Sequence, residues 1–141
     1  MRISRARGGG KPSQHRTDTF TGTVWGAPVL EREDGVVVND VLFEPGARTH
    51  WHTHGTAQVL IVTHGEGFIK VRGGQGALLL PGDVVHISAG EVHWHGATAA
   101  KLMLHTAVSV GGTDWLEPVS DEDYDAALAE GETGGVIGSV G

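Results

Sequence analysis

The residues best suited to chemistry in this sequence are histidines, and eight of the nine lie in the middle of the chain. Three alternate with other residues as His50, His52 and His54, and a second alternating pair follows at His93 and His95. Residues two apart in a β-strand point to the same face, so each group presents its imidazoles on one side. Imidazoles about 7 Å apart along a strand can converge on one ion, because each ring nitrogen reaches inward from its Cα. The pattern predicts a metal centre.

Two further side chains could join or support this centre. Gln58 follows a turn at Gly55 and can return to the same place. His105 shares a strand face with Met103 and Ala107, which are small or flexible enough to line a pocket. A core histidine bonded to the backbone is the alternative reading of His105.

The other histidines carry weaker signals. His50 lies either beside the pocket or at the rim of the fold, and His95 either supports the centre or is a core residue. We expect His64 to be exposed, His86 to lie in the core or at the surface, and His15 to lie in an N-terminal arm.

Short β-strands separated by turns must position these residues. Glycine makes up 23 of the 141 residues, and it punctuates the chain together with proline at regular intervals. This pattern favours an all-β sandwich or barrel over alternating strands and helices. Trp51 and Trp94 alternate with the histidines and are expected to pack in the core. The expected strands are Phe20–Trp25, Val36–Phe43, His50–His54, Gln58–Thr63, Gly67–Arg72, Ala77–Leu80, Val84–Ile87, Glu91–Trp94 and Lys101–Val110.

The two ends of the chain differ from this β-rich middle. Residues 1–17 have no periodicity and are predicted to form a flexible basic arm. Ser120 can cap a short C-terminal helix over Asp121–Glu130, with Gly131 as its stop. The prediction is therefore one domain over residues 18–130, followed by a flexible tail over 131–141.

Composition excludes several classes of protein. The chain has no cysteine, which rules out disulfides, thiolate metal sites and a cysteine nucleophile. Its net charge of −7 argues against a nucleic-acid surface. No apolar run is long enough for a membrane span, and no secretory signal is visible. We therefore expect a cytoplasmic protein that contacts neither nucleic acid nor membrane.

Two sets of spacings resemble the motifs of the cupin superfamily. Five residues match the first motif, with Gln in place of its usual Glu: Gly46, His52, His54, Gln58 and Gly65. Three match the second motif: Gly82, Gly90 and His93. The second motif departs at Ser88 and Ala97, where Pro and Asn are usual. The resemblance implies a single-domain cupin β-barrel or jelly-roll sandwich.

From about Phe20 to Tyr124 the chain further resembles the small manganese-dependent cupin hydroxynitrile lyases. The segments that carry the likeness are Phe20–Val24, Phe43–Thr49, Trp51–His54, Leu60–Thr63, Pro81–Val85 and His93–Gly96. The resemblance implies a ligand set of three His and one Gln: His52, His54, Gln58 and His93. His50 departs from that subgroup, in which a small residue stands beside the site, and His64 and His86 are additional histidines.

The implied reaction is the cleavage or formation of cyanohydrins, with the metal as Lewis acid. His105 is the expected base and His95 the second catalytic histidine. Neutral ligands leave the full charge on the ion, so Gln58 should make it a stronger Lewis acid than Glu would. Mn²⁺ is the expected metal, and Fe²⁺, Ni²⁺ and Zn²⁺ suit the same nitrogen and oxygen ligands. Because the ligating histidines must be neutral, metal affinity is expected to fall below about pH 6.

Two other functions stay open at this point. A three-His iron site could activate O₂, which would make the protein a dioxygenase acting on a small organic substrate. A non-catalytic, metal-containing cupin that binds a ligand is the third reading. In every case the partner is a small molecule, and edge strands predict a homodimer or homotetramer.

Overall fold

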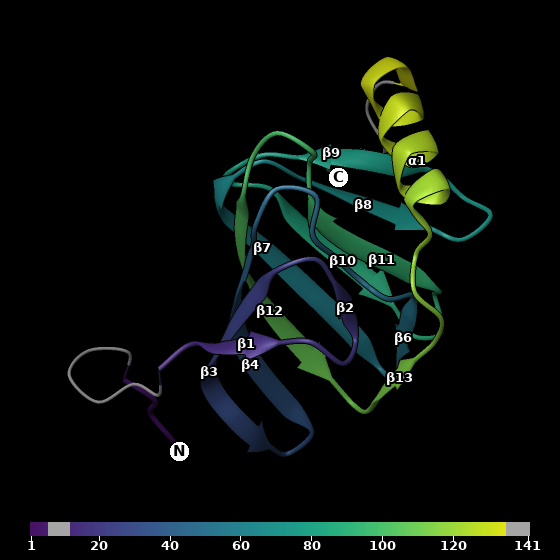
Figure 1. Cartoon of the computed structure of the whole chain (residues 1–141). Helices are drawn as coiled ribbons and strands as arrows, with labels where there is room; N and C mark the ends of the chain where they lie inside the picture. Colours follow the sequence, from purple (N-terminus) through teal and green to yellow (C-terminus); the bar gives the residue numbers. More distant parts are fainter. Residues whose placement is uncertain (6–11, 135–141) are drawn as a thin grey trace.

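Two antiparallel sheets face each other, and the one helix among the described residues lies against the outside of one of them (Figure 1). The computed structural model describes residues 1–5 and 12–134. In spatial order, the first sheet comprises β1 (Gln14–Arg16), β3 (Val24–Glu33), β4 (Val36–Phe43), β12 (Met103–Val110), β7 (Ala57–Gly65) and β10 (Val84–Ser88). The second comprises β13 (Thr113–Trp115), β6 (His52–His54), β11 (His93–Ala97), β5 (Arg48–Thr49) and β2 (Phe20–Thr21), with β8 (Gly67–Val71) paired to β11 and β9 (Gly76–Leu79) paired to β8. The predicted all-β sandwich with a short C-terminal helix is confirmed.

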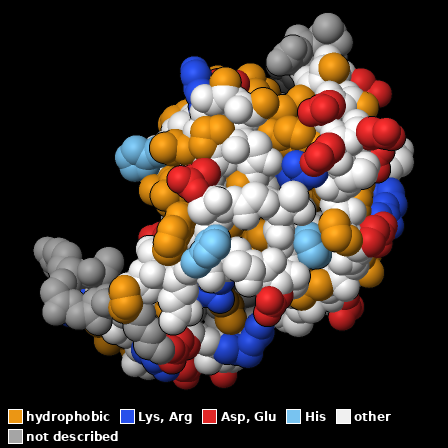
Figure 2. Space-filling model, viewed as in Figure 1, with side chains coloured by type: hydrophobic (Ala, Val, Ile, Leu, Met, Phe, Trp, Pro, Cys, Tyr) orange, Lys and Arg blue, Asp and Glu red, His pale blue; other side chains and the backbone are white. Residues whose placement is uncertain are grey.

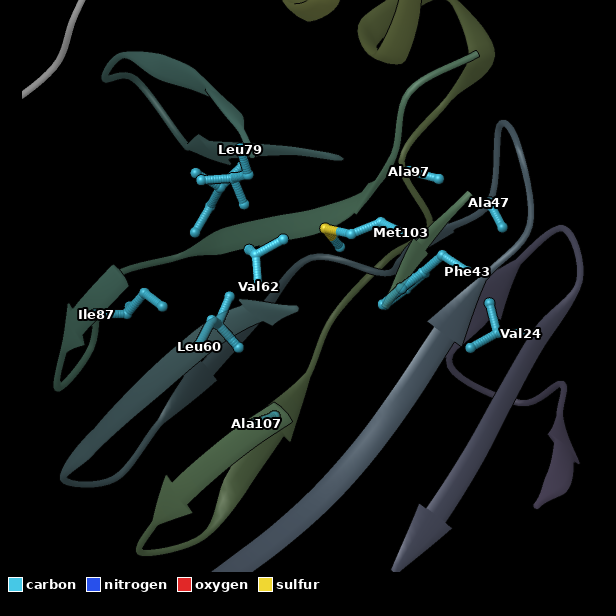
Figure 3. Close-up of a cluster of buried hydrophobic side chains, with 11 residues drawn as sticks. Val24, Phe43, Ala47, Leu60, Val62, Leu79, Ile87, Ala97, Met103 and Ala107 are labelled. Carbon is cyan, nitrogen blue, oxygen red and sulfur yellow. The ribbon is translucent and has the colours of Figure 1, made fainter. Parts of the chain in front are cut away.

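The main core lies between the two sheets, where apolar side chains from both point toward one another (Figure 3). Strand β7 shows how the sequence builds it, because its alternation places Leu60 and Val62 inward and leaves Ile61 exposed. Gln58 is the next residue of the same inward row and is buried. The candidate ligand Gln58 is therefore held in place by the packing of its own strand.

Helix α1 (Asp121–Gly134) covers a second apolar cluster on the outside of the second sheet (Figure 1). It begins as predicted, since the Asp123 backbone N–H donates to Ser120 Oγ at 3.1 Å. Tyr124 packs beside Trp94 and donates its hydroxyl to the Ala97 carbonyl at 2.6 Å. Trp51 is buried in the same cluster, so both tryptophans pack as predicted, here under the helix.

The helix does not stop at Gly131, as the sequence suggested, but continues to Gly134. A Cβ atom at Gly131 would occupy the place of the Phe68 ring. Glycine at this position therefore allows the helix to approach the sheet closely and does not terminate it. No helix in the described ranges is long and apolar enough to cross a membrane.

Part of the expected N-terminal arm is ordered. Residues Gln14–Arg16 form β1, which pairs with the start of β3, and the His15 ring stacks on Trp25 at 5.0 Å between centroids. Three residues are too few to show a period in the sequence, which is why this strand was missed. Other parts of the expected arm and tail, residues 6–11 and 135–141, lie outside the described residues.

Candidate metal centre

Three strands bring the predicted ligands together between the sheets. His52 and His54 come from β6, and His93 on β11 lies directly opposite His52 in the register of the second sheet. Gln58 comes from β7 in the facing sheet. The His52 ring centroid lies 4.1 Å from that of His93 and 5.0 Å from that of His54. The structure thus gathers all four side chains in one buried cluster.

Backbone carbonyls fix the orientation of two of these rings. His52 Nδ1 lies 2.9 Å from the His50 carbonyl, and His93 Nδ1 lies 2.9 Å from the Glu91 carbonyl. Because a carbonyl only accepts, each Nδ1 carries the proton and donates it. Each Nε2 is then left with a lone pair, which is the form in which histidine ligates a metal.

Gln58 and His54 also present free acceptor atoms. The Gln58 amide donates from Nε2 to Ser109 Oγ at 3.1 Å, so its Oε1 faces His93 Nε2 at 3.1 Å. With the His93 proton on Nδ1, both of these atoms are acceptors and could serve as ligands of one cation. His54 Nδ1 lies 3.2 Å from Thr113 Oγ1, while its Nε2 is buried with no hydrogen-bond partner in the described structure. These donors fit a divalent ion.

Burial keeps the histidines of this centre neutral. Burial lowers the pKa of His93 to about 4 from a usual value near 6.5. It also lowers the pKa of His52 well below that value, and the nearby His93 adds to the effect. Burial lowers the pKa of His54 in the same direction. Neutral imidazoles at pH 7 are ready to bind a metal without first losing a proton.

His95 also lies within reach of the same point. One ligand atom from each of His52, His93 and His95 falls within 4.8 Å of the others, which makes a three-His group able to hold a metal ion. Sequence reasoning gave His95 a catalytic role and did not consider it as a ligand. Its position two residues after His93, on the same strand face, was the available signal.

His95 and His105 form a buried pair beside this group. His105 Nε2 lies 3.1 Å from His95 Nδ1, so one proton lies between them, and both residues are almost completely buried. His105 Nδ1 and His95 Nε2 have no hydrogen-bond partner in the described structure. Burial lowers the pKa of His105 to about 4 and, together with the nearby His105, lowers that of His95 well below its usual value. Each ring thus forms its hydrogen bond of 3.1 Å with the other ring.

A cavity of about 380 Å³ connects these groups. Its wall includes the candidate ligands His52, His54 and Gln58 together with both members of the His95–His105 pair. A space of this size is typical of sites for small organic ligands. The chain can therefore bring a small molecule to the candidate metal ligands and to a pair of neutral imidazoles at once.

The other predicted histidines lie outside the cavity wall. His50 falls between β5 and β6, so it does not continue the alternation, and it contributes its carbonyl to His52. His64 is exposed as expected and lies near the end of β7. His86 is exposed on β10, and His15 is exposed on β1.

Two aromatic residues of the cavity were not predicted as part of the site. Trp115 on β13 lies 4.6 Å from His52 between ring centroids and 5.9 Å from Phe20. The short strand β13 pairs with β6, which carries His52 and His54. A three-residue strand beyond the last periodic segment gives almost no signal in a sequence, so its part in the site emerges only from the fold.

Comparisons with known proteins agree with this architecture. The family model described as "Cupin domain" matches residues 39–109. A curated relative named (R)-mandelonitrile lyase, from Granulicella tundricola, is 47% identical over 113 residues, covering 76% of this chain and 86% of its own. A crystal structure of a cupin-like protein from Thermotoga maritima is 44% identical with a TM-score of 0.77, covering 79% of this chain and 90% of that one. A cupin-2 domain from Rhodospirillum rubrum, 18% identical with a TM-score of 0.68 and covering 92% and 94% of the two chains, shares the fold.

The two motif segments, the two facing sheets and the buried histidine cluster thus coincide with a family match over half of the chain. This chain belongs to the cupin family.

Proposed function

We propose that this cupin is a metal-dependent lyase that cleaves or forms cyanohydrins of the mandelonitrile type. One observation carries the proposal. The candidate ligands line the same cavity as the His95–His105 pair, and each ring of that pair has one nitrogen without a hydrogen-bond partner in the described structure. The 47% identity to a relative named (R)-mandelonitrile lyase supports this choice of substrate.

The chain's own residues account for the proton transfers of this reaction. Cleavage requires a base to take the hydroxyl proton while the carbon–carbon bond breaks and cyanide leaves with its electron pair. A base whose pKa is about 4 takes a proton only from an acidified hydroxyl, and a divalent ion would supply that acidification as a Lewis acid. His105 takes the proton, and His95, 3.1 Å away, stabilises the imidazolium and helps return the proton to cyanide, which leaves as HCN.

The proposed ligands are His52, His54, Gln58 and His93, with Mn²⁺ as the metal and Fe²⁺, Ni²⁺ or Zn²⁺ as alternatives. His95 is kept as a catalytic residue because, with His105 as the base, His105 Nε2 donates to His95 Nδ1, which leaves the His95 proton on Nε2 and no lone pair there for a metal. The variants His54→Ala and His95→Ala separate this assignment from the three-His alternative. Metal content after dialysis should fall in His54→Ala and persist in His95→Ala, and the reverse result would assign His95 as the ligand.

The function itself is tested by cyanide release from mandelonitrile. We expect release well above background from Mn²⁺-loaded protein and none from chelator-treated protein or from His52→Ala. His105→Gln should keep its metal and lose turnover, whereas the exposed control His86→Gln should keep both. Absence of release from protein shown to contain manganese would reject the cyanohydrin assignment. In that case Fe²⁺-dependent O₂ uptake with small organic substrates would test the dioxygenase alternative.

A further inference from the structure

The charge lining the cavity is one-sided. None of the sixteen residues that line it is acidic. The four histidines and the glutamine among them are neutral, as described above. Arg32 is the one residue in that wall with a full charge. Arg32 is an exposed residue between Glu31 and Glu33, but of these charged neighbours it alone lines the cavity.

Backbone groups hold the Arg32 side chain in place. Its Nη1 donates to the Gly35 carbonyl at 3.2 Å and to the Gly111 carbonyl at 3.1 Å. Within the described ranges Arg32 forms no salt bridge, and the nearby Glu33 pairs with Arg2 at 2.9 Å instead. A guanidinium has five N–H donors, so most of its donors stay available although the group is oriented.

The register of the strands relates Arg32 to the metal centre. Gly111, which anchors Arg32, lies two residues beyond Ser109, or about 7 Å along the chain. Ser109 in turn accepts the hydrogen bond from Gln58. Arg32 is exposed and therefore lies at the rim of the cavity, linked to the candidate ligand Gln58 through Gly111 and Ser109.

We propose that Arg32 makes this cavity a site for substrates that carry a carboxylate, with that carboxylate at Arg32 and the reacting hydroxyl-bearing carbon at the histidine–glutamine cluster. The placement of the reacting end rests on the proposed function. Guanidinium and carboxylate pair through two parallel hydrogen bonds, which supply orientation as well as affinity. Neutral ligands would leave a bound ion's charge uncompensated, so both ends of the cavity favour an anion over a neutral molecule of the same shape.

A matched pair of probes tests this inference without any catalytic step. We would measure binding of 4-(hydroxymethyl)benzoate and of its neutral amide, 4-(hydroxymethyl)benzamide, to the full chain by calorimetry, as purified and again with a chelator present. The carboxylate should bind at least about tenfold more tightly than the amide. Arg32→Met should remove most of this preference in the chelated samples. Lys101→Met, which changes net charge equally at an exposed site paired with Glu66, should retain it.

The ratio of the carboxylate affinity to the amide affinity shows whether Arg32 recognises the carboxylate or only stabilises the fold. If Arg32 only clasps the backbone at Gly35 and Gly111, Arg32→Met will weaken both probes equally and leave the ratio unchanged, which would overturn the inference. Equal binding of the two probes to the unsubstituted chain, or no binding of the carboxylate at millimolar concentration, would overturn it too. Neither probe contains a nitrile. Carboxylate binding without cyanide release from mandelonitrile would therefore reject the proposed function alone, and the opposite pair of results would reject this inference alone.

Discussion

Acidification should destabilise the metal-free protein strongly because its buried histidines resist protonation. The folded chain holds the pKa of His93 and of His105 at about 4, against a usual value near 6.5 in an unfolded chain. The unfolded chain therefore takes up protons first as the pH falls. The stability that these residues contribute is complete above about pH 6.5 and is lost progressively as the pH falls toward about 4.

The two pKa values set the size of the effect. For one such histidine, the free energy of unfolding should fall by about 2.5 kcal/mol between about pH 7.5 and 4.5. Two of them together contribute about 5 kcal/mol, which is comparable with the whole stability of many domains. We therefore expect the metal-free protein to be largely unfolded near pH 4.5, before most carboxylates have titrated.

Denaturant titrations followed by tryptophan fluorescence at several pH values would measure this loss. The variant His105→Gln removes one of the two titrating groups, so its stability should fall by about 2.5 kcal/mol less over the same interval. The exposed control His86→Gln should follow the unsubstituted protein. If His105→Gln shows the full original pH dependence, His105 is not held neutral by burial, and the reasoning about the His95–His105 pair as a neutral base fails.

Three further predictions concern the metal, the helix and the assembly. Gln58→Glu should raise the affinity for a divalent ion and lower turnover by about tenfold or more, because an anionic ligand offsets the charge on the ion. Chelator competition measures the affinity and cyanide release measures turnover. Unchanged turnover would contradict the argument. Gly131→Ala should destabilise the protein by about 1–3 kcal/mol in thermal or denaturant unfolding, since a Cβ would meet the buried Phe68 ring, although helix propensity alone predicts a gain of about 1 kcal/mol. Val84 on the edge strand β10 is 64% exposed and lies opposite the exposed Ile61, and we propose that this edge forms the contact of the expected homodimer or homotetramer. Val84→Lys should then lower the mass measured by light scattering, whereas a monomeric unsubstituted chain or an unchanged mass would reject the proposal.

Much of the β-structure could be predicted because local signals agree with the fold. Strand β4 has the predicted bounds Val36–Phe43, and β7, β8, β9 and β10 differ from prediction by a few residues at their ends. In each case a β-rich run ends at a glycine or proline turn, and those turns also end the strand. Short strands such as β1 and β13 are set by what they pair with, so no period in the sequence reveals them.

The sequence predicted which residues form the site better than it predicted the contacts between them. Alternation along β6 and β11 placed His52, His54, His93 and His95 on inward faces, because a strand's period is the same wherever it lies. The pairing of His95 with His105 depends on how the two sheets face each other, which no local pattern contains. The pH at which protons compete with the metal for these histidines also depends on burial in the fold, so the sequence alone placed it too high. Burial holds the pKa of His93 at about 4, so metal affinity should persist below the pH of about 6 that an exposed histidine suggests.

The sign of the net charge is a poor guide to what enters this cavity. A group of acidic residues lies on helix α1, at the upper right of the face shown in Figure 2, where acidic side chains also appear along the lower edge; the helix packs on the outside of the second sheet. The cavity opens between the sheets and has no acidic residue in its wall. Charges more than about 8 Å apart are largely screened at physiological ionic strength, whereas Arg32 would act on a bound carboxylate at contact distance. The proposed recognition of a carboxylate therefore depends on this local charge in the cavity wall and not on the net charge of −7.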